Sequence, residues 1–382
     1  MIYTRPCYLE VNLDKLKHNY FEIKKYLKEG TEIIAIVKSD AYHFGDVEIT
    51  EKLISLGVEK FAVATMSEAI SLRKNFKDID ILLLGPVPEY LIEEGIKNNI
   101  VFCIPSLQCA VELNNAAKKL NTVARAHFAV DTGMNRIGFK DNINEAEEAF
   151  KLSNIEVESA FTHLALSDVD EKFTHRQFDK FREFVSAMKE RGCEFKYTDV
   201  SNSHAVLGYR DFDMEYVRPG ILLYGSAEGD KNGKGYEVEF IGEIKAEVSF
   251  IKEVKKGEGI SYGHIFVAEK DMKIATLPIG YADGIVRNLS GKISALVKGK
   301  RVRQVGRICM DQMMIDVTDM DVEVGDVAVI IGRQGSEEIT IEEVADLAGE
   351  IPTSFVTHFS ERLPRHYIED GKLIKIKDDY LR

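Results

Sequence analysis

Residues 8–224 alternate short apolar runs with stretches in which apolar positions recur at helical spacing. The runs typical of strands are Tyr8–Leu13, Ile33–Val37, Phe61–Ala64, Ile81–Leu84, Val101–Ile104, Ala124–Val130, Val157–Thr162, Tyr197–Val200 and Val217–Tyr224. Helical spacing marks Leu13–Leu27, Asp46–Leu56, Ser67–Lys74, Ser106–Leu120 and Phe173–Arg191. Continuous apolar strands are typical of a parallel sheet covered on both faces. The eight runs after the first predict an α/β fold, a (β/α)8 TIM-type barrel, with a doubly wound open sheet as the competing architecture.

The pattern changes after Gly225. Residues 228–235 are polar and rich in glycine, which is typical of a linker. Beyond them, apolar residues alternate with polar ones through Ile244, Ala246, Val248 and Phe250, as in a half-exposed antiparallel strand. Further strand-like runs are Lys273–Leu277, Met313–Val317 and Val327–Ile331, and Thr340–Leu347 is expected to be a short helix with Thr340 as its N-cap. We therefore expect a barrel in residues 1–228 and a mostly β C-terminal domain in residues 229–382, with which the first strand is free to pair.

Composition narrows the class of protein without indicating any chemistry. The chain has 382 residues, 45% of them hydrophobic, and a formal net charge of −13. This is enough apolar material for two folded cores, and the negative charge argues against nucleic-acid and anionic-membrane partners. The five cysteines include no CxxC pair, which favours a reducing compartment over a disulfide framework or a zinc site. Because no apolar N-terminal segment or membrane span is seen, we expect a cytoplasmic protein without a metal site.

Polar residues follow several of the predicted barrel strands directly. Lys38 comes after Ile33–Val37, His163 after residues 160–162, and Asn202 and Ser203 after residues 197–201. Each has an ordinary explanation, such as a lysine that extends to solvent or a histidine satisfied in the core. Arg218 lies in the last run, where a buried guanidinium needs an acceptor for its donors. Since chemistry in such barrels lies at the C-terminal ends of the strands, their joint placement predicts a site there.

A series of motifs then resembles one enzyme family in chain order. They are AIVKSDAYHFG (35–45), VDTGMNRIG (130–138), THLA (162–165), SNS (201–203), VRPG (217–220), ISYG (260–263), GYADG (280–284), GRICMDQ (306–312) and RLPR (362–365). The first is similar to the pyridoxal-phosphate lysine motif of the alanine racemase family, and the second to that family's VDTGMxRxG segment. The resemblance extends from Lys38 to Arg365 and implies a barrel followed by a β domain, in agreement with the pattern.

The resemblance implies two-base racemisation of an amino acid, foremost L-alanine to D-alanine for cell-wall peptidoglycan. Pyridoxal phosphate, bound covalently to Lys38, is the electron sink that a weakly acidic α-proton requires. Lys38 becomes the base on one face of the substrate and Tyr262 the base on the other. A phenol has an ordinary pKa of roughly 10, so it must be tuned to act near neutrality. In the family, residues matching His163 and Arg218 lie near that phenol.

The resemblance also assigns binding roles. Arg218 faces the pyridine nitrogen of the cofactor and leaves that nitrogen unprotonated, since a guanidinium keeps its proton at working pH. The cofactor residues it implies are Lys38, Tyr42, His163, Asn202, Ser203, Arg218, Gly220 and Ile221. The substrate residues it implies are Arg136, Tyr281, Met310 and Asp311. Because Tyr262, Met310 and Asp311 belong to the second domain, the resemblance implies a head-to-tail homodimer whose sites combine two subunits.

The chain departs from the family pattern at several positions. Ala129 stands where many members carry a carbamylated lysine that holds the arginine matching Arg136, so a bound anion such as chloride is our hypothesis there. Residues 40 and 43–45 read Asp and His-Phe-Gly in place of Asn and Gly-His-Gly, and Thr353-Ser354 replaces a Tyr-Glu pair, which puts one phosphate contact in doubt. Glu361 precedes Arg362 and is either a solvated charge or a partner for a cationic substrate side chain.

Other functions remain open at this point. A racemase of serine, or of lysine or ornithine, is the nearest alternative. A barrel-fold pyridoxal-phosphate decarboxylase shares the architecture, but it usually places a carboxylate at the pyridine nitrogen, whereas this chain has Arg218 and the Tyr262 motif. A non-catalytic cofactor-binding protein is the third alternative, and the presence of both Lys38 and Tyr262 argues against it. Release of carbon dioxide would identify a decarboxylase.

Overall fold

The computed structural model describes residues 4–140, 142–227 and 235–381. Within them, eight parallel strands form one sheet in the order β4-β3-β2-β9-β8-β7-β6-β5. These strands are β2 (Glu32–Ile36), β3 (Lys60–Val63), β4 (Asp80–Leu83), β5 (Phe102–Ile104), β6 (Ala124–Val130), β7 (Ile155–Thr162), β8 (Tyr197–Asn202) and β9 (Tyr216–Arg218). The two ends of the sheet meet through a parallel bridge between Leu82 and Val101, so the predicted barrel is confirmed and is nearly closed.

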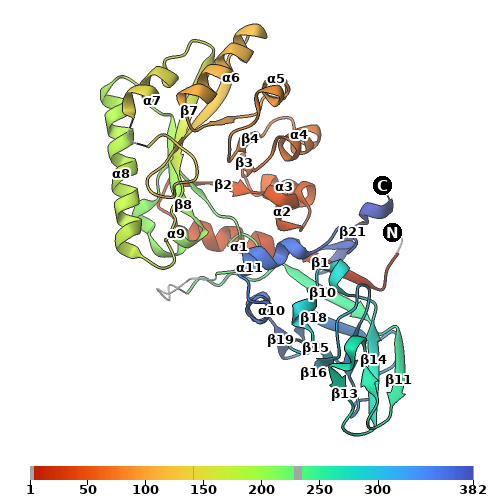
Figure 1. The fold of residues 1–382 in the computed structure, drawn as a ribbon. Helices are drawn as coiled ribbons and strands as arrows, with labels where there is room; N and C mark the ends of the chain where they lie inside the picture. Colours follow the sequence, from red (N-terminus) through yellow and green to blue (C-terminus); the bar gives the residue numbers. More distant parts are fainter. Residues whose placement is uncertain (1–3, 141, 228–234, 382) are drawn as a thin grey trace.

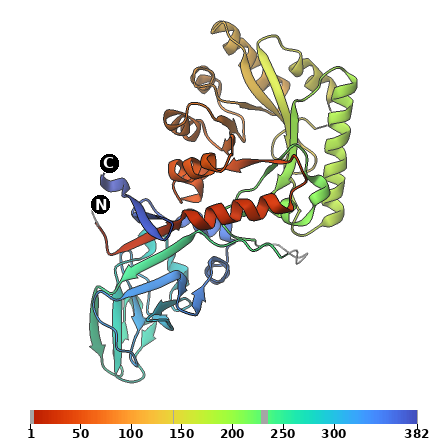
Figure 2. The ribbon, with the colours of Figure 1, turned by 180° about the vertical axis from the view of Figure 1, so that it is seen from behind.

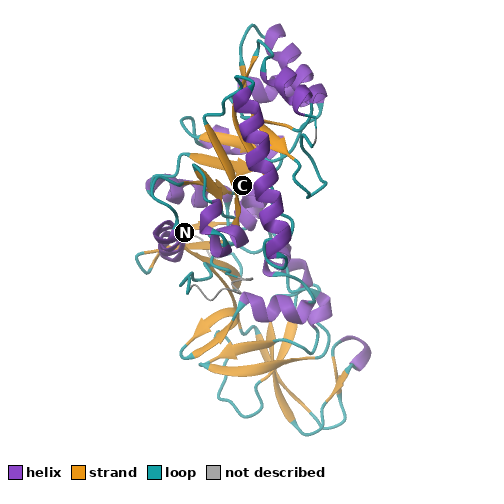
Figure 3. Cartoon of the chain, turned by 90° about the vertical axis from the view of Figure 1, so that its left-hand side faces the viewer, coloured by secondary structure: helices purple, strands orange, loops and turns teal. Residues whose placement is uncertain are grey.

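Helices cover the outside of the barrel, as Figure 3 shows in purple. They are α1 (Leu13–Tyr26), α3 (Asp46–Ser55), α4 (Met66–Asn75), α5 (Glu89–Lys97), α6 (Leu107–Lys119), α7 (Ile143–Phe150), α8 (Glu171–Glu190) and α9 (Ser203–Gly208). Side chains cap most of their N-termini. Ser106 accepts from the amide of Cys109, and Thr65 forms a reciprocal capping box with Glu68. Local sequence therefore sets where these helices begin, next to the strand ends that carry the polar residues.

A second sheet forms the C-terminal domain, below the barrel in Figure 1. Among the described residues its path is β11-β14-β17-β16-β15-β18-β10-β1-β20-β21, and β19 pairs with β18. The strands are β1 (Cys7–Asn12), β10 (Gly242–Glu247), β11 (Phe250–Val254), β14 (Met272–Leu277), β15 (Ser294–Val297), β16 (Lys300–Val305), β17 (Met313–Asp316), β18 (Val327–Gln334), β19 (Glu337–Ile339), β20 (Arg365–Glu369) and β21 (Lys372–Lys377). Short elements complete the domain: β12 (Gly259–Ile260), β13 (Phe266–Val267), α10 (Ile341–Ala348) and α11 (Pro352–Phe355). Thr340 caps α10 as expected.

The first strand belongs to this second sheet. β1 lies between β10, to which it is antiparallel, and β20, to which it is parallel. The chain then passes directly into α1, which runs along the junction of the two domains (Figure 2). The predicted linker at 228–235 falls almost wholly outside the described residues. No helix in the described part of the chain is long and apolar enough to cross a bilayer.

Two predicted strands are wrong in extent. The run 217–224 was expected to be one strand, but β9 ends at Arg218. Pro219 lacks an N–H for the ladder, and the amides of Gly220 and Leu222 donate to Ser203 Oγ instead, so residues 219–225 form turns. The run 244–250 was also expected to be continuous, but β10 ends at Glu247. There the backbone changes partners, since Val248 N donates to Asp326 O and Ser249 N donates to Thr276 O.

The two domains share an aromatic cluster beside the barrel rim. Phe44 is fully buried, and its ring centroid lies 5.4 Å from that of Tyr224, 5.8 Å from Phe240 and 6.4 Å from Phe359. Phe240 precedes β10 and Phe359 follows α11, so the second domain supplies two of these rings. Phe44 is the phenylalanine of the His-Phe-Gly segment that differs from the family pattern, and it packs in a core shared by the two domains. This packing fixes the C-terminal domain against the loop after β2.

Candidate active site

A cavity of about 390 Å³ opens at the C-terminal ends of the barrel strands. Every barrel residue predicted for the site lines it: Lys38, Tyr42, Arg136, His163, Asn202, Ser203, Arg218, Gly220 and Ile221. Sequence reasoning did not single out Ala64, Leu84, Gly85, Phe161 and His204, which also line it. Most of these lie at or just past the end of a strand, so the strand-end rule would have found them if applied to small and apolar residues as well as polar ones.

Lys38 follows β2 at the bottom of the cavity wall. Burial lowers the pKa of its amine, the nearby charge of Arg136 lowers it further, and Glu68 opposes this shift. Glu68 also accepts from the amide of Ser39 at 2.7 Å, which ties the loop after β2 to the start of α4. A lowered pKa increases the fraction of neutral amine, the form that acts as a nucleophile and a base.

Neutral donors gather around Ser203 and Gly220. The amides of Gly220 and Leu222 reach Ser203 Oγ at 2.9 and 3.4 Å. A Cβ on Gly220 would lie 2.4 Å from Tyr42 Oη, so only glycine allows the backbone to approach the phenol this closely. Burial keeps the pKa of Tyr42 well above its ordinary value, so its hydroxyl remains a donor. Hydroxyls and backbone amides in such a concave arrangement suit a phosphate group.

Arg218 is buried and paired with Asp199, a residue that sequence reasoning did not identify. Its Nη1 contacts the Asp199 carboxylate, and Nη2 donates to the carbonyl of Thr162 at 2.6 Å and to that of Val200 at 3.3 Å. Burial and the charge of Arg136 lower the pKa of the guanidinium to about 9, which is still above neutral pH. Arg218 therefore stays charged. Its need for an acceptor was predicted, and a carboxylate inside a buried strand was the signal for Asp199.

His163 lies after β7 beside these charges. Burial lowers the pKa of its imidazole to about 3, with further contributions from Arg218, Arg136 and Lys38. Its ring is consequently neutral at any working pH, and it can donate one hydrogen bond and accept another. The loop around it is fixed by Gln177, whose amide nitrogen donates to the carbonyl of His163 at 3.2 Å.

Arg136 reaches the cavity from the loop after β6. Asp131 Oδ1 accepts from the amides of Gly133 and Asn135 at 3.0 and 2.9 Å, which builds the turn that precedes Arg136. Within the described residues, no carboxylate forms an ion pair with its guanidinium. Ala129, where many family members carry a carbamylated lysine, is buried in a small apolar cluster with Phe161. The protein thus offers Arg136 no anionic partner in the described part, and the bound-anion hypothesis stays open.

The substrate and base residues predicted from the second domain lie elsewhere. Tyr262 is 68% exposed and lines a separate pocket with His264 and Cys309, while Met310 is 51% exposed. The backbone brings this group together, because the amide of Tyr281 donates to the carbonyl of Cys309 at 3.0 Å. The barrel cavity and the exposed face on the β domain are therefore separate places in this chain. Asp311 on that face pairs with Arg362 at 2.7 Å.

The family models decide the identity of the fold. The alanine racemase N-terminal domain matches residues 11–228, and the alanine racemase C-terminal domain matches residues 241–367. The chain belongs to the alanine racemase family. An alanine racemase of Clostridium tetani is 40% identical over 98% of this chain and 99% of its own length. The structure of alanine racemase from Bacillus anthracis with bound L-Ala-P superposes with a TM-score of 0.93, at 33% identity, over 100% of this chain and 99% of that one.

The cofactor of this family fits the cavity. The structure of alanine racemase from Bartonella henselae, which carries covalently bound pyridoxal phosphate, gives a TM-score of 0.85 at 25% identity, covering 96% of this chain and 100% of that one. Here a partly buried amine, a set of neutral phosphate donors and a buried guanidinium line one space of suitable size. Lys38 supplies that amine, Ser203 and Gly220 belong to the neutral donors, and Arg218 is that guanidinium.

The first prediction concerns the buried Arg218–Asp199 pair. Asp199→Asn leaves the guanidinium buried without its counter-charge, so we expect the free energy of unfolding to fall by about 3–5 kcal/mol in urea titrations. Asp179→Asn, which changes an exposed aspartate on α8, is the control and should change it by less than about 0.5 kcal/mol. Replacing both partners with apolar residues should restore part of the loss. If Asp199→Asn were as stable as the control Asp179→Asn, the Arg218–Asp199 pair would not be formed.

The second prediction concerns pH. In the unfolded chain, His163 has the ordinary pKa of roughly 6.5 and is protonated below that pH. In the folded chain its pKa is about 3, so it stays neutral until the pH falls to that value. The unfolded state then holds more protons, so lowering the pH from 7 to 5 should reduce the free energy of unfolding by up to about 2 kcal/mol through this one group. His163→Gln should remove that part of the pH dependence. A pH profile unchanged by the substitution would contradict a neutral, buried His163.

Proposed function

We propose that the protein is a pyridoxal-phosphate-dependent racemase that interconverts L- and D-alanine. The observation that carries this proposal is the convergence of Lys38, Ser203 and Arg218 on one cavity in a chain that belongs to the alanine racemase family. When bound, the cofactor supplies the electron sink that makes the α-proton of an amino acid removable. We assign Lys38 Nζ as the base that holds or returns the proton on one face, which its lowered pKa supports.

The second base is Tyr262 in this proposal. Its phenol is exposed on the β domain and does not line the cavity of its own chain. We infer a head-to-tail homodimer in which the partner subunit's Tyr262 closes the cavity opposite Lys38, together with the partner subunit's Tyr281, Met310 and Asp311. The exposure of this face in a single chain supports the inference, because a catalytic base acts in a site from which water is excluded, and a partner subunit would exclude it here.

Arg218 has a specific role in the proposed chemistry. Arg218 lines the cavity from a buried position, and its pairing with Asp199 and its hydrogen bonds to two backbone carbonyls hold the guanidinium in place. A ring nitrogen that faces such a donor accepts a hydrogen bond and gains no proton. The electron sink is then weaker than one with a protonated ring, which favours return of the proton to Cα over side reactions such as transamination or decarboxylation. This is the reason for preferring a racemase to a decarboxylase.

The substrate carboxylate is assigned to Arg136 and to the amide of the partner subunit's Met310. Because Ala129 offers Arg136 no carboxylate, we keep the hypothesis that a bound anion such as chloride pairs with its guanidinium. Thr353 lines the cavity where the family often has tyrosine, so a phosphate contact from that phenol is missing. Its hydroxyl is the one observation that favours serine as a second substrate. Glu361 is exposed and interacts electrostatically with His43, which leaves its role toward basic substrates open.

The proposed reaction has a simple cellular setting. D-Alanine is a component of cell-wall peptidoglycan, and we propose that the enzyme supplies it from L-alanine in the cytoplasm. The division into a barrel of residues 1–228 and a β domain of residues 229–382 remains part of the proposal, and it gives each half of the composite site to one domain.

The third prediction tests the reaction. With pyridoxal phosphate added, the purified protein should racemise L-alanine with a kcat/KM at least about tenfold above those for L-serine, L-lysine and L-ornithine, followed by polarimetry and by chiral chromatography. No carbon dioxide should be released. Lys38→Ala should abolish turnover and the visible absorbance of the lysine-bound cofactor, whereas Lys17→Ala, at an exposed lysine, should retain both. Faster turnover of serine or of a basic amino acid would replace alanine as the substrate.

The fourth prediction tests the composite site. Lys38→Ala and Tyr262→Phe are each expected to be nearly inactive, because each removes one base from both sites of a homodimer. Refolded or coexpressed together, they form mixed dimers in which one of the two sites has both bases. Random assortment then restores roughly a quarter of the wild-type activity.

The matched control mixes Lys38→Ala with Arg136→Ala, two changes on the same barrel half. No mixed dimer of this pair contains an intact site, so activity should stay at the level of the single variants. Restoration by the control pair, or none by the Lys38 and Tyr262 pair, would contradict a site shared between subunits.

A further inference from the structure

The loop that connects Lys38 to the rest of the barrel has an unusual backbone. Residues 39–43 follow Lys38 within the segment labelled α2 (Lys38–Tyr42), and each has a positive φ, between 50° and 66°. No glycine is present in this stretch, so it is a turn of left-handed helix built from L-residues. Such a conformation is unfavourable for L-residues and persists only where the surroundings hold it.

The turn matters because it carries two cavity residues. Lys38 precedes it and Tyr42 lies within it, so its winding sets the direction of both side chains relative to the cavity. Inside the turn, His43 N donates to Ser39 O at 2.8 Å and Gly45 N donates to Asp40 O at 2.9 Å. These hydrogen bonds do not use the carbonyls of residues 43 and 44, which therefore need donors from elsewhere.

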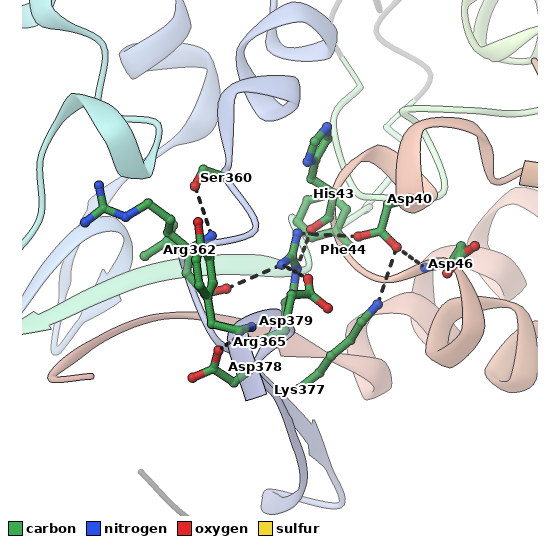
Figure 4. Close-up of polar contacts among 12 residues, drawn as sticks. Asp40, His43, Phe44, Asp46, Ser360, Arg362, Arg365, Lys377, Asp378 and Asp379 are labelled. Atoms are coloured by element: carbon green, nitrogen blue, oxygen red, sulfur yellow. Dashed lines mark hydrogen bonds and ion pairs between the residues drawn. The ribbon is translucent and has the colours of Figure 1, made fainter. Parts of the chain in front are cut away.

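The donors come from strand β20 of the C-terminal domain. Arg365 Nε donates to the carbonyl of His43 at 3.1 Å, and Tyr367 Oη donates to the carbonyl of Phe44 at 3.0 Å. Arg365 also pairs with the carboxylate of Asp40 at 3.4 Å. Figure 4 shows Arg365 beside His43 and Asp40, with dashed lines for its contacts. A β-strand outside the barrel thus holds the end of the turn and the acidic residue in its middle.

Two acidic groups, one buried and one partly buried, hold the Arg365 side chain in position. Its side chain is fully buried, and it pairs with Asp379, which is 3% exposed, at 3.1 Å. The carboxylate of Asp40 has further partners in the amide of Asp46 at 2.9 Å and Lys377 at 3.5 Å. A buried guanidinium is costly unless its donors are satisfied, and the donors of Arg365 are divided between Asp379 and the turn residues His43 and Asp40. Packing alone would be served by an apolar side chain.

We propose that Arg365 is a positioning residue for the cofactor lysine: with Tyr367, it holds the left-handed turn 39–43 so that Lys38 and Tyr42 point into the cavity. The proposal deepens the proposed function, on which it rests, and assigns a task to the last arginine of the RLPR motif. It also gives the β domain a role toward the cavity of its own chain, distinct from the role of Tyr262 toward the partner's cavity.

The test compares variants of the holoenzyme. Arg365→Lys keeps a positive charge but cannot donate to His43 O and pair with Asp379 and Asp40 in one plane. It should weaken pyridoxal-phosphate binding about tenfold or more, measured by the visible absorbance of the lysine-bound cofactor in titrations, and lower kcat with a smaller change in KM. Tyr367→Phe removes the contacts of the hydroxyl with Phe44 O and with the Glu48 carboxylate, and it should weaken cofactor binding by a few-fold.

A second ion pair between the same two domains provides the matched control. Lys52 on α3 pairs with Glu369 on β20 at 2.5 Å and does not touch the turn. Lys52→Met should lose about as much resistance to urea as the variants above, or less, yet bind the cofactor as tightly as wild type. A merely structural Arg365 would lower stability and leave the cofactor affinity of the folded protein unchanged, which would overturn the proposal.

The outcomes are separable from failure of the proposed function. If wild type forms no borohydride-fixed adduct of pyridoxal phosphate on Lys38, detected by mass spectrometry, the proposed function fails. If wild type and Lys52→Met form it and Arg365→Lys forms it with equal affinity, the positioning role fails. Should Arg365→Lys not fold, Tyr367→Phe decides, and wild-type cofactor affinity in that variant would reject the role.

Discussion

The cavity at the barrel rim gathers Lys38, Arg136 and Arg218, and the repulsion among these cations in a poorly solvated space governs the rest of the site. Each cation is handled differently. Arg218 is neutralised from behind by Asp199, Lys38 has a lowered pKa and so a larger neutral fraction, and Arg136 keeps to the exposed edge without an anionic partner in the described part of the chain. His163, surrounded by all three, stays uncharged. A ligand carrying a phosphate and a carboxylate relieves this repulsion, which is why a protein of net charge −13 offers an anion site.

Much of the barrel could be predicted from the sequence, because its strands are continuous apolar runs and its helices have local caps such as Thr65 and Ser106. The last strand could not, since the ladder ends where Pro219 lacks a donor and Ser203 takes over the next amides, a contact between residues far apart in the chain. In the β domain, edge strands such as Lys372–Lys377 have exposed, lysine-rich sequences without a clear apolar alternation, so only their pairing with β20 identifies them.

The site shows the same division. Residues at strand ends were found because topology alone places them at one rim. Asp199 was missed because it lies within a buried strand, and its importance depends on the side chain of Arg218 on the neighbouring strand. The left-handed turn was missed because residues 39–43 include no glycine to signal positive φ. Its end contacts Arg365 and Tyr367, more than 300 residues away, and we propose that these contacts hold a conformation that no local propensity encodes.

The C-terminal domain therefore has two proposed roles at different places. Through β20 it holds the turn that carries Lys38 in its own chain, and through the exposed face around Tyr262 it completes the cavity of a partner. Both places belong to a continuous network of strands, since β20 pairs with β1, β1 with β10, and the sheet runs on to β14 and β17 beside that face. A sheet of this kind resists deformation, so the two bases of a composite site need not be adjusted independently. In the proposed dimer, the distance between the two bases depends on how each barrel packs against the β domain of its own chain and against that of the partner. A displacement of one β domain would therefore move the lysine of one cavity and the tyrosine of the other together.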